Sequence, residues 1–324
     1  MKLLLLASTL LCVSFSAVAS YNDAEEAFNN HYYTDALSGF MQEIKKNGDY
    51  RAQFYVGKIY LEGLGVNQDT KKGLDYLQQS ADQGYDSAQA LLGYLYEEGK
   101  VVPQNKRKAI NLYKDAASHN NSSAMFNLGL AYYQGDIVAK DDQKAIELLE
   151  KVPADVIPMV GRYLGDIYLS TNDLEKAIRS YEKSAKQEDI ESYYALANIY
   201  AKDEALSEKA VTYYSYAASQ GSVAAQYMLG TMYANGDLVS RNVALGHAWL
   251  KMAADQRYSP AEESRKQLEK DMSRSDLERA RKEFLKLQQD VLGKLESPFI
   301  EEQRIQAEID KKNQEKMTFN AKNN

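Results

Sequence analysis

One phrase of amino acids recurs along most of this chain of 324 residues. Each copy starts with a small residue, taken here as position zero, and the next copy follows after about 32 to 36 residues. Repeats of this length are typical of helix pairs that stack on one another to share a core. The copies begin at Ala52, Ala88, Ala124, Val160, Ser192, Ala225 and Ala261.

The first part of each repeat has the periodicity of a helix. Positions zero, four, five and eight fall on one helical face at 100° per residue, and they hold a small residue, Val or Leu, Gly or Ala, and Tyr. A glycine inside a helix costs about 1 kcal/mol relative to alanine. We therefore expect a neighbouring helix to pack closely at position five, which holds Gly57, Gly93, Gly129, Gly165, Ala197 and Gly230.

A turn and a second amphipathic helix follow in each repeat. A further glycine at position eleven, for example Gly99 or Gly236, suits the left-handed cap at a helix end. The repeats that start at Val160 and Ser192 have shorter turns without this glycine. We predict an all-α fold, a right-handed α-solenoid of about six to seven helix–turn–helix repeats.

The recurring motif A-x-x-x-L-G-x-x-Y-x-x-G-x-x-V resembles that of the Sel1-like repeat family, a relative of the tetratricopeptide repeats. Residues 52–84 and 225–256 carry the motif almost whole. The resemblance implies a stacked helical fold and a protein-binding role in cell-envelope assembly, envelope signalling or host interaction. It does not choose among these roles.

The first residues have the composition of a secretory signal. Lys2 precedes an apolar run that ends in small residues, so we predict cleavage after Ala19 and a periplasmic or secreted bacterial protein. A membrane anchor is the weaker alternative because the run is shorter than the roughly 20 residues that a bilayer requires. A lipoprotein would use Cys12, but Leu11 stands before it where a small residue is expected. We expect no membrane-spanning segment after signal removal.

The remaining chain divides by composition. Residues 20–51 resemble a degenerate first repeat, with Ala36 at the second-helix register. The polar tail has two interpretations, a solvated or disordered segment and a docking segment. The predicted division is 1–19 signal peptide, 20–51 degenerate repeat, 52–260 Sel1-like repeats, 261–296 capping helices and 297–324 polar tail.

Enzyme chemistry has little support in this sequence. Ser180 and Lys183 form an S-x-x-K motif, but the companion motifs of penicillin-recognising enzymes are absent. The three histidines are far apart in the sequence, and Cys12 is the only cysteine. A net charge of −7 argues against nucleic-acid binding. We expect no catalytic residues, no metal and no cofactor.

The arc of each first helix opposite the repeat motif is unexpectedly aromatic. In tetratricopeptide-like solenoids the first helices line the concave groove, and aromatic residues are enriched at binding sites. Two interpretations remain open, packing of these rings on the next repeat and contact with a partner. We expect Tyr94, Phe126 and Tyr133 at the groove centre. The candidate partner-binding residues are Phe54, Tyr94, Phe126, Tyr133, Arg162, Tyr194 and Tyr227.

The function that these features predict is a non-enzymatic scaffold or adaptor that binds a protein partner of unknown identity. One alternative is a periplasmic regulator that restrains a membrane sensor. An enzyme acting on envelope polymers is a second alternative, which requires a pocket with convergent polar groups between repeats.

Overall fold

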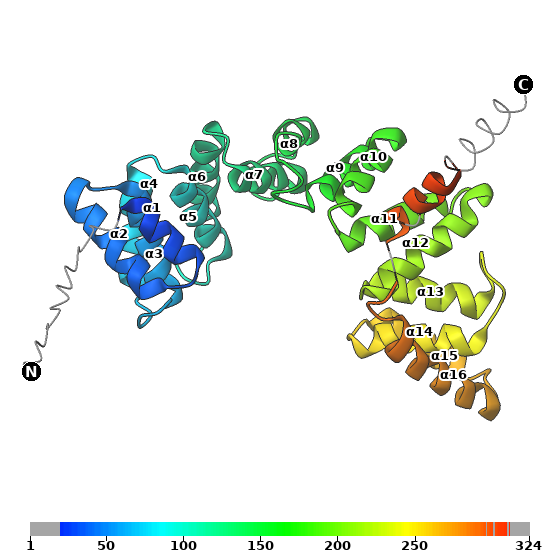
Figure 1. The fold of residues 1–324 in the computed structure, drawn as a ribbon. Coiled ribbons are helices and arrows are strands. Elements are labelled where there is room, and N and C mark those ends of the chain that lie inside the picture. The colour runs from blue at the N-terminus through cyan, green and yellow to red at the C-terminus, as the bar shows by residue number, and fades with distance from the viewer. Residues whose placement is uncertain (1–19, 296, 301, 310, 312–324) are drawn as a thin grey trace, which may run out of the picture. The chain divides into compact units, whose positions relative to one another are not determined.

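The computed structural model describes residues 20–295, 297–300, 302–309 and 311, and it assigns no strand within them (Figure 1). The predicted signal peptide, residues 1–19, lies outside the described residues. Helix pairs follow one another along the chain, which confirms the all-α repeat fold. The chain forms two compact units, the first ending at Leu148 and the second beginning at Leu149.

Unit 1 contains the degenerate repeat and the first three full repeats. Residues 20–51 supply two helices and the start of a third, and Ala36 is fully buried in the second. The helices are α1 (Tyr21–Asn29), α2 (Tyr33–Asn47), α3 (Tyr50–Glu62), α4 (Thr70–Asp82), α5 (Asp86–Glu98), α6 (Lys106–Ser118), α7 (Ser122–Gln134) and α8 (Asp142–Leu149), the last of which ends at the unit boundary.

Unit 2 contains the remaining repeats and the closing helices. It comprises α9 (Val160–Ser170), α10 (Leu174–Ala185), α11 (Ile190–Tyr200), the short η1 (Glu204–Leu206), α12 (Ser207–Ser219), α13 (Val223–Asn235), α14 (Val243–Asp255), α15 (Ser259–Glu269), α16 (Arg274–Lys286) and η2 (Leu287–Val291).

The position-five glycines lie where two helices touch. A Cβ atom on Gly93 would lie 2.6 Å from Cε1 of Tyr113, and one on Gly57 would lie 2.7 Å from Cγ of Leu77. Both distances are below any normal carbon–carbon contact. The expected close packing at this register is therefore confirmed at these sites.

The turns follow the predicted chemistry. Gly99 and Gly236 end their helices with φ of 71° and 90°, in the left-handed region that glycine adopts without a steric penalty. The connection between α8 and α9 is different. Pro153 and Pro158 lie in it, and proline removes a backbone donor and disfavours helix at the preceding residue. The helical array is interrupted here, next to the unit boundary.

Tyrosine is a core residue in this protein. Several tyrosines are 1% exposed or less, and the single tryptophan, Trp249, is also a core residue at 4% exposed. Tyrosine rings supply large apolar area, while each buried hydroxyl requires a partner. The fully buried tyrosines are Tyr113, Tyr181, Tyr193, Tyr213 and Tyr214.

The C-terminal helices turn back along the second helices of unit 2. Helix α16 packs on α14, and the backbone N–H of Gly293 donates to the carbonyl of Ser219 at the end of α12. The buried side of α16 is centred on Ala280, and Leu277 on the same helix is 39% exposed. The chain is helical again from Pro298, and Phe299 is buried.

Candidate functional site

The first helix of each repeat carries positions two, six, nine and ten on one side, which we call the first-helix face. The seven predicted binding residues divide between the two units, and each unit is described by itself. Unit 1 holds Phe54, Tyr94, Phe126 and Tyr133, and unit 2 holds Arg162, Tyr194 and Tyr227.

The unit 1 aromatics differ in how much surface they offer to a partner. Tyr94 is 48% exposed, whereas Phe126 is 9% exposed and lies mostly within the core. The ring of Phe54 packs edge-on against Tyr85, with 5.4 Å between centroids. Tyr94 is thus the most accessible of the three residues expected at the groove centre, and partner contact by this set stays a prediction.

In unit 2 a hollow of about 330 Å³ opens between the first helices α9 and α11. Residues at positions two, six and ten line this hollow. The repeat positions from which Arg162 and Tyr194 were predicted therefore also supply its other polar lining residues. Asp166, Asn198 and Lys202 supply the remaining polar groups at these positions. The structure therefore brings two of the predicted residues to one site.

Arg162 and Asp166, which both line this hollow, are each held by a partner. Nε of Arg162 lies 3.3 Å from Oδ2 of Asp189, and the guanidinium carbon lies 4.6 Å from the ring centroid of Tyr163. The hydroxyl of Tyr181 donates to Oδ1 of Asp166 at 2.6 Å. Desolvation raises the pKa of Asp166, and the bond from Tyr181 and the charge of Arg162 act against this rise.

Tyrosines of the second helices reach through to the first-helix face. Besides Tyr181, the hydroxyl of Tyr214 donates to Oδ1 of Asn198 at 2.7 Å. In unit 1 the hydroxyl of Tyr113 donates to Oε2 of Glu97, also at 2.7 Å. Burial raises the pKa of Tyr113 far above its usual value, so its proton stays available as a donor. These hydroxyls fix the polar side chains that face solvent.

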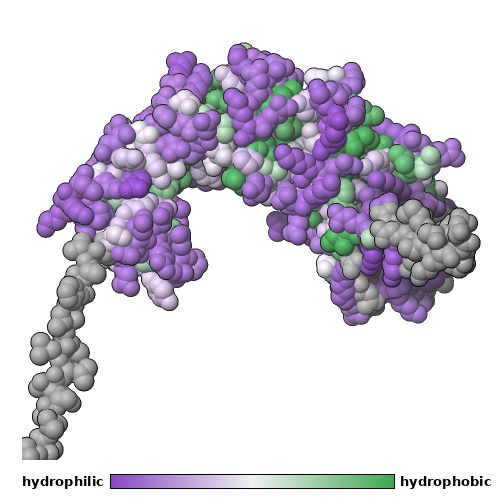
Figure 2. Space-filling view, turned by 45° about the horizontal axis from the view of Figure 1, so that its top comes forward, coloured by the Kyte–Doolittle hydropathy of each residue, from purple (hydrophilic) through white to green (hydrophobic). Residues whose placement is uncertain are grey.

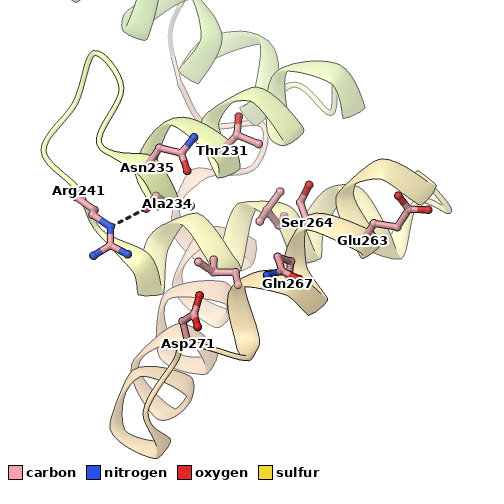
Figure 3. A pocket seen from close by; sticks show the side chains of 10 residues that line it. Thr231, Ala234, Asn235, Arg241, Glu263, Ser264, Gln267 and Asp271 are labelled. Carbon is pink, nitrogen blue, oxygen red and sulfur yellow. Dashed lines mark hydrogen bonds between the residues drawn. The ribbon is translucent and has the colours of Figure 1, made fainter.

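A second hollow of about 640 Å³ lies between the first helices α13 and α15 (Figure 3). Thr231 and Asn235 extend from α13, Gln267 faces them from α15, and Asp271 lies in the turn after α15. Nε of Arg241 donates to the carbonyl of Ala234 at 2.9 Å and holds the arginine at one edge. This hollow has the convergent polar groups between repeats that an enzyme acting on envelope polymers would require, so that alternative stays a prediction.

The α15 side of this hollow and the tyrosine hydroxyls are not among the residues predicted from the sequence. Counting from Ala261, positions two, six and ten are Glu263, Gln267 and Asp271, so the repeat register contains a signal for the α15 side. Residues 261–296 lack the Leu-Gly-x-x-Tyr motif, which favours a cap over a further repeat. Tyr227, by contrast, was predicted for a groove and packs edge-on against Tyr258, with 5.4 Å between centroids.

The outer surface gives few further chemical signals. Most of the face turned to the viewer in Figure 2 is hydrophilic, and apolar residues form small patches on it. Within the described ranges, no three His, Cys, Asp or Glu side chains gather closely enough to hold a metal ion. None of the described helices combines the length and apolar character that a bilayer crossing requires.

These helix pairs, with glycine at the contact and a glycine cap at the turn, define an α-helical repeat protein. The Sel1 repeat pattern matches residues 51–85, 86–121, 122–151, 159–189, 190–222 and 223–258, so the chain belongs to the Sel1 repeat family. The matched segments begin within two residues of the repeat starts taken from the sequence. Sel1 repeats form a non-enzymatic fold, and proteins built from them generally act as scaffolds for protein interaction.

Two examples of solved structures that are similar to this chain are both repeat proteins. A protective antigen present in uropathogenic Escherichia coli strains, displaying an SLR fold, superposes with a TM-score of 0.73 at 24% identity over 84% of this chain. The chain spans 62% of that antigen's length. A Sel1 repeat protein from Oxalobacter formigenes gives a TM-score of 0.62 at 27% identity, over 73% of this chain and 100% of the other.

Proposed function

We propose that this protein is a non-enzymatic scaffold or adaptor that binds a segment of a protein partner on the first-helix face of unit 2. The observation that carries the proposal is the recurrence of one register. Positions two, six and ten line both the hollow between α9 and α11 and the hollow between α13 and α15.

The form and chemistry of these hollows favour a polypeptide. Sites that recur with the repeat suit an extended chain, whose side chains also recur at regular intervals. The side-chain amide of Asn198 is oriented by Tyr214, which occupies its oxygen and leaves the nitrogen as a donor. Donors of this kind bind main-chain carbonyl groups without demanding one particular side chain. The proposed ligand is therefore an extended polar segment.

The proposed location is the periplasm or the cell exterior, reached through the predicted signal. The chain after Ala19 contains no cysteine, so an oxidising compartment would impose no disulfide on it. Cell fractionation followed by N-terminal sequencing tests this location. A mature chain that begins at Ser20 in the periplasm or medium supports it, and a cytoplasmic chain that retains Met1 contradicts it.

Site-specific photocrosslinking tests the binding face. A photoreactive residue is placed at Asn198 or Asn235 on the first-helix face, and in matched controls at Glu175 or Lys183 on the second helix α10. We expect one protein to be crosslinked in cells from the first two positions and not from the controls. Crosslinking from the α10 positions alone would overturn the proposed site.

A further inference from the structure

A third hollow, of about 770 Å³, lies in unit 2 beside the turn between α13 and α14. The turn contributes residues 239–242 to its lining, and α16 contributes Asp276 and Arg279. We call it the turn hollow. Asp276 and Arg279 form an ion pair with each other, so the charges that α16 brings cancel. A hollow of this volume suits a small molecule.

One lining residue, Arg241, departs from its counterparts in the earlier repeats. Sixteen residues after the repeat start, the side-chain amides of Gln68 and Gln104 donate to first-helix carbonyl groups at 2.7 and 2.8 Å. Arg241 holds this position in its repeat and makes the equivalent bond to Ala234 through Nε, which leaves two terminal nitrogens that point away from Ala234 (Figure 3). No carboxylate of the described residues pairs with Arg241. The turn hollow therefore contains one uncompensated positive charge.

The ring of Tyr233, which also lines the turn hollow, lacks the lysine that covers its counterparts. In the first three full repeats a lysine at position twenty lies over the tyrosine at position eight. The distances from Nζ to the ring centroid are 3.9 Å for Lys72, 4.2 Å for Lys108 and 5.4 Å for Lys144. Position twenty of the last full repeat is Leu245, and no lysine or arginine of the described chain lies over Tyr233. A ring that a cation covers elsewhere is thus part of the lining here.

We propose that the turn hollow binds a small organic anion, with a carboxylate or phosphate group on Arg241 and a flat apolar part on the ring of Tyr233. The terminal nitrogens of arginine form a planar fork that binds such groups through two parallel hydrogen bonds. An aromatic ring offers a large apolar area to a flat ligand. Val243 and Ala244, the first residues of α14, also line the hollow, and the positive end of the helix dipole adds to the attraction. This ligand is distinct from the protein segment proposed for the first-helix face.

Fluorine NMR of the full chain measures the binding of matched probes. The probes are para-fluorobenzoate and para-fluorophenyl phosphate, which carry the two anionic groups, and para-fluorobenzamide, which is neutral. We expect at least one anion to bind and the amide not to bind, and the tighter anion identifies the group that the site takes. Binding of neither anion, or equal binding of the amide, would overturn the proposal.

Substitution of Arg241 tests the charged group. Arg241→Gln should weaken the tighter anion about tenfold, because it removes the charged donors while glutamine can keep the bond to Ala234, as it does in the first two full repeats. Lys140→Gln is the matched control, because Lys140 holds the same position in its repeat and lies 3.3 Å from Asp142. The control should bind the anion as the unmodified chain does. An unchanged affinity in Arg241→Gln would contradict the assignment.

A second variant separates the turn hollow from its neighbour. Arg241 also lines the hollow between α13 and α15, whereas Tyr233 lines only the turn hollow of these two. Tyr233→Leu should therefore weaken the tighter anion about fivefold. The same affinity as in the unmodified chain would show that the anion does not bind in the turn hollow. No protein partner enters these measurements, so either result leaves the proposed partner face to its own crosslinking test.

Discussion

Substitution of Gly93 by alanine gives opposite results under two physical accounts of the repeat. If helix propensity dominates, alanine stabilises α5 by about 1 kcal/mol, because glycine is the poorer helix former. If packing dominates, the variant loses stability. The added Cβ would lie 2.6 Å from Cε1 and 2.8 Å from Cδ1 of Tyr113, whose ring is fully buried. The ring must move.

The magnitude follows from what that movement disturbs. Forcing one extra carbon into a filled core costs about 1–3 kcal/mol. Displacement of Tyr113 also weakens the 2.7 Å bond from its hydroxyl to Glu97, which is worth about 1 kcal/mol at a partly exposed acceptor. After subtraction of the propensity gain, we expect Gly93→Ala to lower the free energy of unfolding by about 2 kcal/mol.

Urea unfolding followed by circular dichroism measures this change. Repeat arrays need not unfold in one step, so the comparison uses the transition of unit 1, reported by a probe placed there. Ala197 provides the matched control, since alanine occupies position five naturally in its repeat. Ala197→Gly should destabilise unit 2 by about 1 kcal/mol through propensity, and by a further amount because the methyl of Ala197 is fully buried. A Gly93→Ala chain as stable as the original would refute the packing account.

Two further predictions concern single carboxylates. Asp166→Asn keeps an acceptor for Tyr181 and removes the free-energy penalty of the buried charge. Because the pKa of Asp166 is raised in the folded state, the original chain loses stability as the pH rises from the ordinary value of 3.8 through the folded pKa. The variant should therefore have the higher melting temperature at neutral pH and lose this advantage below pH 3.8. Thermal melts at both pH values decide this, and an advantage only in acid would contradict it. Asp49 caps α3 by accepting hydrogen bonds from the backbone N–H groups of Arg51 and Ala52. Asp49→Ala should therefore lower the free energy of unfolding in urea by about 1 kcal/mol, whereas Asp49→Asn, which keeps an acceptor, should retain most of the capping stability. Equal losses in both variants would show that the charge matters more than the cap.

The fold was predictable because its determinants are local and repeated. Glycine at position eleven defines a helix end, and the spacing of small and large residues defines the buried side of each first helix. Both signals act within a few residues of Gly99 or Gly93 and recur along the chain, so each copy supports the others. The interruption near Pro153 was not predicted, because the period of the repeat continues across it.

The site was predicted only in part, because some of its polar groups come from the second helices and not from the first-helix register. Arg162 and Tyr194 were found from the first-helix register alone. The hydroxyl of Tyr181, which donates to Asp166, comes from the second helix, where a tyrosine ring looks like ordinary core.

The glycine at position five therefore has a consequence for recognition as well as for packing. It makes room for the second-helix residue, which is leucine at Leu77 and Leu250 but tyrosine at Tyr113 and Tyr181. Leucine only fills the space, whereas tyrosine extends a hydroxyl to the first-helix face and fixes an acidic side chain there. A change between these two residues inside the core would alter the polar surface that a partner meets without changing any residue on it. Specificity in such a repeat is then set partly from beneath the surface, so a comparison limited to exposed positions would miss it.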